Sequence, residues 1–246
     1  MKTWNTSSGY TITRLLSGRS NVFLLTNGEK NILIDTSPKY VWNKLEKRLK
    51  QLNVDIIDYL ILTHTHYDHA ENSKKIKEKY NAQVIVHKHE ASYLTSGENI
   101  LPKGTNVITK LIIRLFAKQF LPYAKYEPCQ YDYLVDSTFD LSNIGFNAYI
   151  MHTPGHTIGS MSIIIDDELA IVGDTMFGVF KWSVFPPYAD NIIQMIDSWG
   201  RLLKTNCKIF IPAHGSANSR SLVQKEYDKW IKKISRTNIT IVHSIQ

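Results

Sequence analysis

The chain has 246 residues, of which 43% are hydrophobic and 21% are charged, and these values are ordinary for a soluble globular protein. No window approaches the roughly 18 consecutive apolar residues of a membrane-spanning helix, and the first residues lack the apolar core of a signal peptide. We therefore expect a cytoplasmic protein with no membrane partner. The net charge of +7 fits a solvated, lysine-rich surface, which we favour over binding to an anionic substrate or nucleic acid.

The chain has no internal repeat, low-complexity tract or linker, so we expect a single domain over residues 1–246. The two cysteines, Cys129 and Cys207, lack the spacing of a metal site and are interpreted as free thiols. In the first half of the chain, apolar runs predict strands over Tyr10–Leu16, Asn21–Thr26, Asn31–Asp35, Asp58–Thr63 and Gln83–His87.

Two helices are expected among these strands. Ser37 would cap the first helix with Pro38 at its first position, and apolar residues then recur at helical spacing up to Leu52. The second helix covers Ser73–Tyr80. The segment 98–130 differs, because three prolines surround an amphipathic stretch at Val107–Leu121. We interpret it as a surface helix packed on the core, with a lid or a homodimer contact as the alternatives.

The second half of the chain repeats the order of strands followed by helices. Strands are predicted over Phe146–His152, Met161–Asp166, Leu169–Gly173 and Lys208–Ile211, and helices over Asn191–Leu203 and Leu222–Ser235. The tail at 238–243 has no assignment. Two such sets of strands indicate two sheets packed together with helices outside them.

The densest cluster of ionisable residues lies in the stretch LILTHTHYDHAEN at 60–72. It holds His64, His66, Asp68 and His69 in the pattern His-x-His-x-Asp-His, directly after a predicted buried strand. Imidazoles and carboxylates are natural ligands of Zn²⁺, Fe and Mn at hydrolytic sites. On an extended turn the first two histidines can face one ion, and Asp68 with His69 can face a second.

Two ions need more ligands than this stretch offers, and three later stretches supply them. His156 lies in MHTPGHTIGS, Asp174 in AIVGDTMFG and His214 in IFIPAHGS, and each follows a predicted strand. Loops at strand ends combine a rigid scaffold with a free backbone, so functional side chains collect there. The sequence therefore predicts a metal site built from four strand ends.

Together these motifs resemble the metallo-β-lactamase superfamily, above all its glyoxalase II-like and lactonase-like hydrolases. The resemblance implies an α+β fold, a four-layer αββα sandwich with a binuclear metal site at the loop edges of two sheets. It assigns His64, His66 and His156 to one metal, Asp68, His69 and His214 to the other, and Asp174 to both. It also places Asp35 behind the ligands, although that residue could equally cap the following helix.

Some positions depart from particular branches of the family. One class of secreted β-lactamases carries a cysteine where Asp174 stands, so antibiotic hydrolysis is not expected here. Lactonases carry a tyrosine where this chain has Phe177, and Ser37 stands where glycine is common. The glutathione-binding region of glyoxalase II is not recognisable.

We therefore expect a hydrolase with two divalent ions, Zn²⁺ first and Fe or Mn as alternatives, whose bridging hydroxide attacks a small ester, thioester or lactone. Asp68 would ligate one ion and orient the hydroxide. Phe177, Trp182 and Tyr188 are candidates for contact with the substrate. The alternatives are a phosphodiesterase or nuclease of the same fold and a di-iron redox protein. The remaining histidines, His87, His89 and His152, are expected to be structural.

Overall fold

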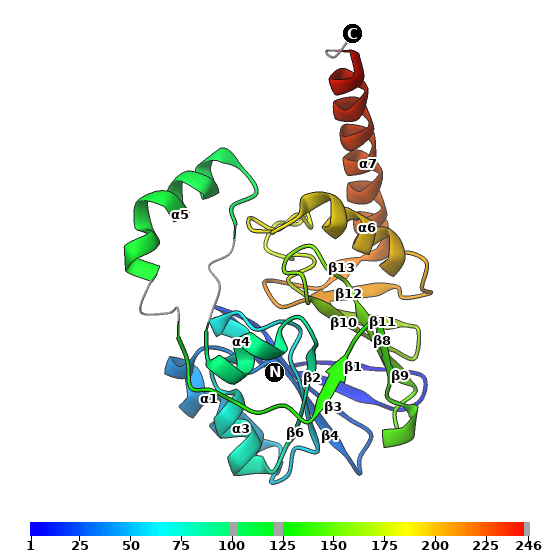
Figure 1. Ribbon diagram of the computed structural model, residues 1–246. Helices are drawn as coiled ribbons and strands as arrows, with labels where there is room; N and C mark the ends of the chain where they lie inside the picture. The colour runs from blue at the N-terminus through cyan, green and yellow to red at the C-terminus, as the bar shows by residue number, and fades with distance from the viewer. Residues whose placement is uncertain (99–102, 121–124, 244–246) are drawn as a thin grey trace.

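Two β-sheets packed face to face form the centre of the molecule (Figure 1). The computed structural model describes residues 1–98, 103–120 and 125–243. The first sheet contains, in spatial order, β1 (Lys2–Asn5), β2 (Thr11–Leu16), β3 (Val22–Thr26), β4 (Asn31–Ile34), β5 (Tyr59–Ile61), β6 (Gln83–His87) and β7 (Tyr133–Val135). The second contains, in spatial order, β13 (Asn218–Ser219), β12 (Ile209–Pro212), β11 (Leu169–Gly173), β10 (Met161–Ile165), β9 (Ala148–His152) and β8 (Thr138–Asp140).

Helices cover the outer face of each sheet. On the first sheet the layer contains α1 (Trp42–Gln51), α3 (Ser73–Tyr80) and α4 (Ala91–Ser96); on the second it contains α6 (Ile192–Leu202) and α7 (Arg220–His243). The short helix α2 (Tyr67–Ala70) lies between β5 and α3, and α5 (Val107–Phe120) projects from the body. This order of layers is the predicted four-layer αββα sandwich.

Alternation along the strands explains why the central strands of both sheets are largely apolar. In β4, Leu33 packs under the outer helices while Ile32 and Ile34 face the second sheet. In β10, Ile163 faces the first sheet and Ile164 lies beneath α6 and α7. Successive side chains of a strand point to opposite faces, so a strand with both faces covered must be apolar at every position.

Most predicted strands and helices are confirmed within one or two residues, but the start of the first helix is wrong. Ser37 has φ of 63°, and its hydroxyl contacts that of Ser20 at 2.9 Å, so it does not cap the helix. A 3₁₀ turn at Lys39–Val41 leads into α1 instead. Positive φ is a conformation that glycine adopts readily and serine rarely, so Ser37 is held here by its surroundings.

Other differences concern short elements and ends. The unpredicted strands and α-helices are β1, β7, β8, β13, α2 and α4, each of at most six residues. The last helix is longer than predicted, and its backbone includes the unassigned tail at 238–243. Residue 121, the predicted end of the amphipathic helix, lies outside the described residues.

Both cysteines are free and buried. No helix of the described chain has the length and apolar character needed to cross a membrane.

Strand direction brings several chain segments to one edge of the sandwich. β4, β5 and β6 are parallel, so their carboxyl ends lie together, and β11 and β12 are parallel in the other sheet. The backbone N–H of Met161 donates to the carbonyl of Thr63 at 2.8 Å, which joins the two sheets at this edge. Every loop that carries a predicted ligand begins here.

Two of the histidines outside the predicted ligand set also join the sheets. His87 at the end of β6 stacks on His152 at the end of β9, with ring centroids 4.0 Å apart. Nδ1 of His87 accepts from the N–H of His89, so Nε2 carries the proton and donates to the Asp136 carbonyl. Burial, and then the neighbouring imidazole of His152, lower the pKa of His87 to about 4.

We expect His87 to make the protein less stable in acid. An unfolded histidine titrates near pH 6.5, so between about pH 6.5 and 4 the unfolded chain binds the additional proton and the free energy of unfolding falls as pH falls. Urea denaturation at about pH 7.5 and about pH 5 should show a loss smaller by about 1–2 kcal/mol in His87→Gln than in the wild type. His89→Gln, which changes an exposed ring, should keep the wild-type difference. Equal losses in His87→Gln and wild type would contradict this role.

Candidate metal centre

The structure brings all seven predicted ligand side chains together at the shared edge of the sheets. His64 follows β5, His156 lies between β9 and β10, Asp174 follows β11 and His214 follows β12. His66 precedes α2, and Asp68 and His69 lie within this helix. All are buried except His214, whose side chain is 14% exposed. The helical turn lets neighbouring residues 68 and 69 both face the cluster.

The first group of side chains consists of three imidazoles. Nε2 of His64 lies 2.9 Å from Nδ1 of His66, and Nε2 of His156 lies 3.1 Å from the same atom. The three nitrogens lie within 4.8 Å of one another. Such spacing lets all three donate lone pairs to one cation.

The second group combines imidazoles with carboxylates. Asp68, His69 and His214 offer donor atoms that again lie within 4.8 Å of one another. Asp174 reaches both groups: its Oδ2 is 3.4 Å from Nε2 of His156 and 3.2 Å from Nε2 of His214, and its Oδ1 is 3.6 Å from Nε2 of His69. Asp174 is therefore placed between the two groups.

Hydrogen bonds on the outer side of the rings fix which nitrogen faces inward. Nδ1 of His69 donates to Oδ2 of Asp35 at 2.9 Å, and Nδ1 of His156 donates to the carbonyl of Tyr188 at 2.9 Å. Asp35 also accepts from the backbone N–H of Thr63 at 2.8 Å. A partner on the outer nitrogen orients a ligand ring and raises the basicity of the inner nitrogen. Asp35 thus contacts a candidate ligand and does not cap the following helix.

The electrostatics of the two groups differ. Burial, and then neighbouring imidazoles, hold the pKa of His64 and of His66 well below its ordinary value, so both rings are neutral. For His69 burial opposes protonation, but Asp174 and Asp35 raise its pKa to about 10. Burial likewise opposes the charge on Asp174, yet His214 and His69 lower the pKa of this carboxyl. One group thus offers neutral nitrogens, while the other holds an ionised carboxylate that needs positive charge beside it.

Two buried atoms without hydrogen-bond partners also indicate that these side chains bind divalent cations. Nε2 of His69 and Oδ1 of Asp174 are buried without a hydrogen-bond partner. Unpartnered buried polar atoms are rare in folded proteins, and a metal ion is one of the few groups that satisfies a nitrogen and an oxygen together. The residues present therefore fit a metal site.

Polar residues that the sequence did not single out hold the loops of this site. Ser20 donates to the carbonyl of Asp68 at 2.5 Å, and Thr36 donates through Oγ1 to the carbonyl of His69 at 2.8 Å. Asn21 donates through Nδ2 to the carbonyls of Pro212 and Gly215, on either side of His214. These residues follow strands but belong to no ligand motif, so no sequence pattern marked them.

Glu90 is another residue that the sequence did not mark, and it joins two of the ligand loops. Its buried carboxylate accepts from the backbone N–H and the hydroxyl of Thr65, at 3.0 and 2.5 Å, and from the N–H of Gly159 at 3.2 Å. The Tyr126 hydroxyl donates to the carbonyl of the same Thr65 at 3.1 Å. Thr65 separates His64 from His66, so Glu90 ties the loop carrying these two ligands to the loop carrying His156.

The three residues proposed to contact substrate occupy different positions. The ring of Phe177 packs against His214, with centroids 4.6 Å apart. Tyr188 offers its backbone carbonyl to His156. Trp182 is 70% exposed, and its ring lies beside that of Phe180 in a tilted arrangement with centroids 5.3 Å apart. Phe177 therefore lies beside the cluster, whereas Trp182 lies on the surface.

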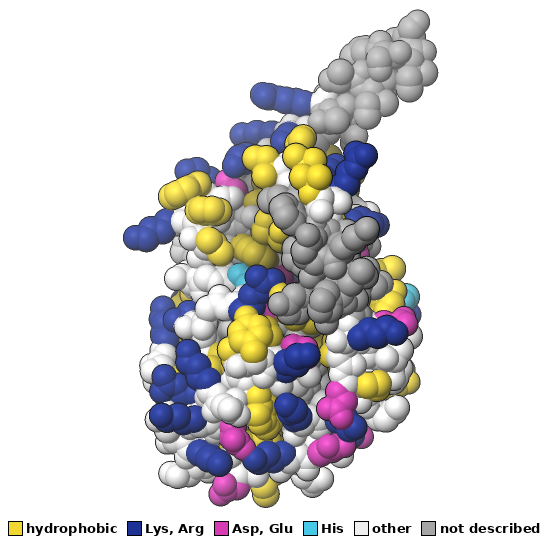
Figure 2. Space-filling view, turned by 90° about the vertical axis from the view of Figure 1, so that its left-hand side faces the viewer, with side chains coloured by type: hydrophobic (Ala, Val, Ile, Leu, Met, Phe, Trp, Pro, Cys, Tyr) yellow, Lys and Arg dark blue, Asp and Glu magenta, His cyan; other side chains and the backbone are white. Residues whose placement is uncertain are grey.

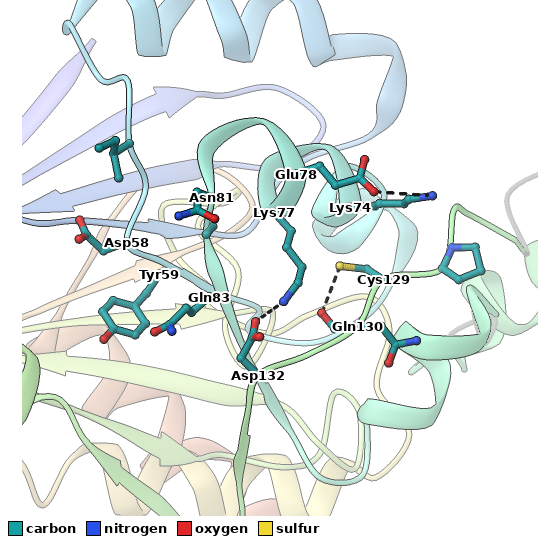
Figure 3. A pocket seen from close by; sticks show the side chains of 13 residues that line it. Asp58, Tyr59, Lys74, Lys77, Glu78, Asn81, Gln83, Cys129, Gln130 and Asp132 are labelled. Atoms are coloured by element: carbon teal, nitrogen blue, oxygen red, sulfur yellow. Dashed lines mark hydrogen bonds and ion pairs between the residues drawn. The ribbon is translucent and has the colours of Figure 1, made fainter.

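A separate hollow of about 680 Å³ lies beside α3 and β6 (Figure 3). Its charged groups are largely paired, Lys77 with Asp132 and Lys74 with Glu78 and Glu127. Among the described residues, the groups able to hold a metal all belong to the cluster at the sheet edge. The chemistry of this protein is therefore assigned to that cluster and not to this hollow.

Comparison with known proteins places the chain among metallo-hydrolases. The family model of the Metallo-beta-lactamase superfamily matches residues 17–214. "Probable metallo-hydrolase MJ0888" of Methanocaldococcus jannaschii is 32% identical over 207 residues, 82% of this chain and 90% of that protein. Hydroxyacylglutathione hydrolase of Shewanella pealeana is 24% identical over 201 residues, 78% of this chain and 62% of that protein. The crystal structure of ST1585 from Sulfolobus tokodaii has the same fold, with a TM-score of 0.64, 20% identity and coverage of 89% of this chain and 86% of that one.

We expect Glu90→Gln to weaken metal binding by about 10–100-fold, because the amide nitrogen of glutamine cannot accept from the N–H groups that the carboxylate now serves. The affinity of the metal-free protein for Zn²⁺ can be measured by competition with a chromophoric chelator. Glu226→Gln is the matched control, since Glu226 is also buried but bonds to Ser183 and Lys229. If the two variants bind Zn²⁺ equally well, Glu90 does not position the ligands.

Proposed function

The chain belongs to the metallo-beta-lactamase superfamily and is a metal-dependent hydrolase; we propose that it uses two divalent cations to hydrolyse a small ester, thioester or lactone. The observation that carries the proposal is the position of Asp174, which is within 3.6 Å of His69, His156 and His214 and so contacts both ligand groups. A carboxylate held between two sets of imidazoles is suited to binding two cations at once.

The proposed ligands divide as the resemblance implies. His64, His66 and His156 would hold one cation, and Asp68, His69 and His214 would hold the other, with Asp174 shared. Histidine and carboxylate ligands suit Zn²⁺, Fe or Mn, and we propose Zn²⁺ as the resident metal. When bound, the two cations would polarise the substrate and lower the pKa of a water molecule toward neutrality.

Asp68 is the residue proposed to orient the attacking water. Its Oδ2 lies 3.7 Å from Nε2 of His214 and 3.5 Å from Nε of Arg19. Its Oδ1 faces His69 at 3.9 Å. A carboxylate with one oxygen committed to a ligand position has a second oxygen that can accept a hydrogen bond from water. Asp68 would therefore fix the direction from which water approaches the electrophilic carbon.

The positions of Arg19 and Phe177 favour a small substrate that has an anionic group and an apolar group. Arg19 lies beside Asp68, and its side chain is 51% exposed, so its guanidinium is accessible to a ligand. Phe177 presents an aromatic ring against His214. The name of the relative hydroxyacylglutathione hydrolase supports a thioester among the candidate classes. We propose an acyl compound whose carboxylate or other anion faces Arg19.

We expect His66→Ala and Asp174→Ala to abolish turnover while the fold is kept, because each removes a lone pair that the chain supplies to the cations. Turnover, bound metal and circular dichroism should be measured on each variant. His89→Ala is the control, since this exposed histidine is outside the ligand groups. Rates close to wild type in Asp174→Ala, with its metal content reduced, would refute the hydrolytic role of the site.

A substrate screen separates the proposed reaction from its alternatives. We expect metal-loaded protein to hydrolyse thioesters, aryl esters or lactones, and to lose that activity after treatment with a chelator. The same preparation should be tested on bis-p-nitrophenyl phosphate and RNA. Turnover confined to phosphodiesters would assign a phosphodiesterase, and retained iron with redox activity but no hydrolysis would assign a redox protein. Either result would reject the proposed reaction.

A further inference from the structure

We propose that α5 binds, lying flat, to the surface of an anionic lipid bilayer. The outer side of this helix is apolar and exposed: Val107 is 81% exposed, Ile108 71%, Leu111 52% and Leu115 62%. These positions lie on one side of a helix, whereas Thr109 on the opposite side is buried. Large apolar side chains that gather on an exposed surface indicate an interaction site.

The charge of the segment identifies the partner. From Asn99 to Tyr126 the sequence contains Lys103, Lys110, Arg114, Lys118 and Lys125 and no acidic residue. Lys110 and Arg114 are exposed on α5 itself, next to its apolar side. A helix with an apolar stripe flanked by basic residues binds at the interface of membranes that contain anionic lipids. A second copy of this chain would instead oppose one basic helix to another.

The length of α5 determines how it would lie. Its 14 residues extend about 21 Å, which is shorter than the hydrocarbon core of a bilayer at about 30 Å. The helix therefore cannot cross a bilayer, but it can lie in the interface with its apolar side toward the acyl chains. The lack of a membrane-spanning segment predicted no membrane partner, but a helix that lies in the interface needs no such segment.

A second exposed apolar segment is held near the start of α5. Val179 is 57% exposed, Phe180 54% and Trp182 70%, with Lys181 among them. Thr105 donates to the carbonyls of Pro186 and Pro187, and Gly104 forms a bridge with Tyr188, so the start of α5 is attached to the chain that follows this loop. Figure 2 shows hydrophobic side chains beside Lys and Arg in the upper half of one face. Exposed Trp and Phe residues are typical of proteins that lie at a bilayer interface.

Sedimentation of the full-length protein with vesicles tests this inference. We expect binding to vesicles that contain phosphatidylglycerol, little binding to pure phosphatidylcholine, and release of the protein in high salt. Leu111→Glu with Leu115→Glu should abolish binding, and Lys110→Glu with Arg114→Glu should weaken it by at least about tenfold. Ile56→Glu is the matched control, since Ile56 is an equally exposed apolar residue at 60% but lies beside the hollow of Figure 3.

Several results would overturn the inference. Equal binding to neutral and anionic vesicles, or unchanged binding in the α5 variants, would remove it. A dimer in light scattering that Leu111→Glu dissociates, without vesicle binding, would show that a second copy covers the helix. Circular dichroism of each variant establishes that the protein is folded. The measurement needs neither metal nor substrate, so its outcome is independent of the proposed hydrolysis.

Discussion

The charge of the Asp174 carboxylate is the constraint on which the site depends. This group is 4% exposed between two apolar sheets, where an ionised carboxylate is unfavourable unless positive groups or hydrogen-bond donors face it. Three imidazoles surround it, and one of its oxygens still lacks a hydrogen-bond partner. Without a metal, only protons on the imidazoles can balance the charge of Asp174. Divalent cations would balance this charge and would also accept the lone pairs of the carboxylate and imidazoles.

The sandwich makes this concentration of polar groups possible at the edge of an apolar core. Parallel neighbours such as β4, β5 and β6 end at one edge, so their following residues converge there without long connections. The polar backbone at that edge is satisfied by short side chains such as Ser20, Thr36 and Asn21. Because these groups are themselves buried, they limit the freedom of the ligand loops. Rigidity at the site therefore comes from hydrogen bonds outside the ligand set.

Much of this arrangement could be predicted from the chain itself. Continuous apolar runs gave the central strands, because strands covered on both faces are apolar at every position. The ligand side chains were found from the His-x-His-x-Asp-His pattern and from their places in loops after predicted strands, and the family resemblance divided them between two metals. Elements of a few residues, such as α2 and β8, carry too little periodicity to be recognised. The start of the first helix was mispredicted because Ser37 has a positive φ that serine rarely adopts, and tertiary contacts with Ser20 overrode the capping preference.

Residues that position the ligands indirectly could not be predicted from the sequence for a different reason. Glu90 is separated from Thr65 by 25 positions and from Gly159 by 69, and no motif links the three. A lone glutamate before a short helix is indistinguishable in sequence from a surface residue. Its role follows only from the structure, since a buried carboxyl group needs hydrogen-bond partners and those of Glu90 come from nearby loops. The hydrogen bonds it accepts happen to come from both loops that carry the first group of histidines.

Tyr188 contacts both the candidate metal centre and the segment that leads into α5. Tyr188 accepts a hydrogen bond from His156 through its carbonyl, and it also forms a bridge with Gly104 just before α5. Gly104 has no room for a side chain, because a Cβ there would lie 2.4 Å from the backbone nitrogen of Lys110. The start of α5 is thus packed closely on its own first turn and on the segment that orients a candidate ligand. Tyr188 thus links the amino end of α5 to the outer nitrogen of His156 by direct contacts on both sides.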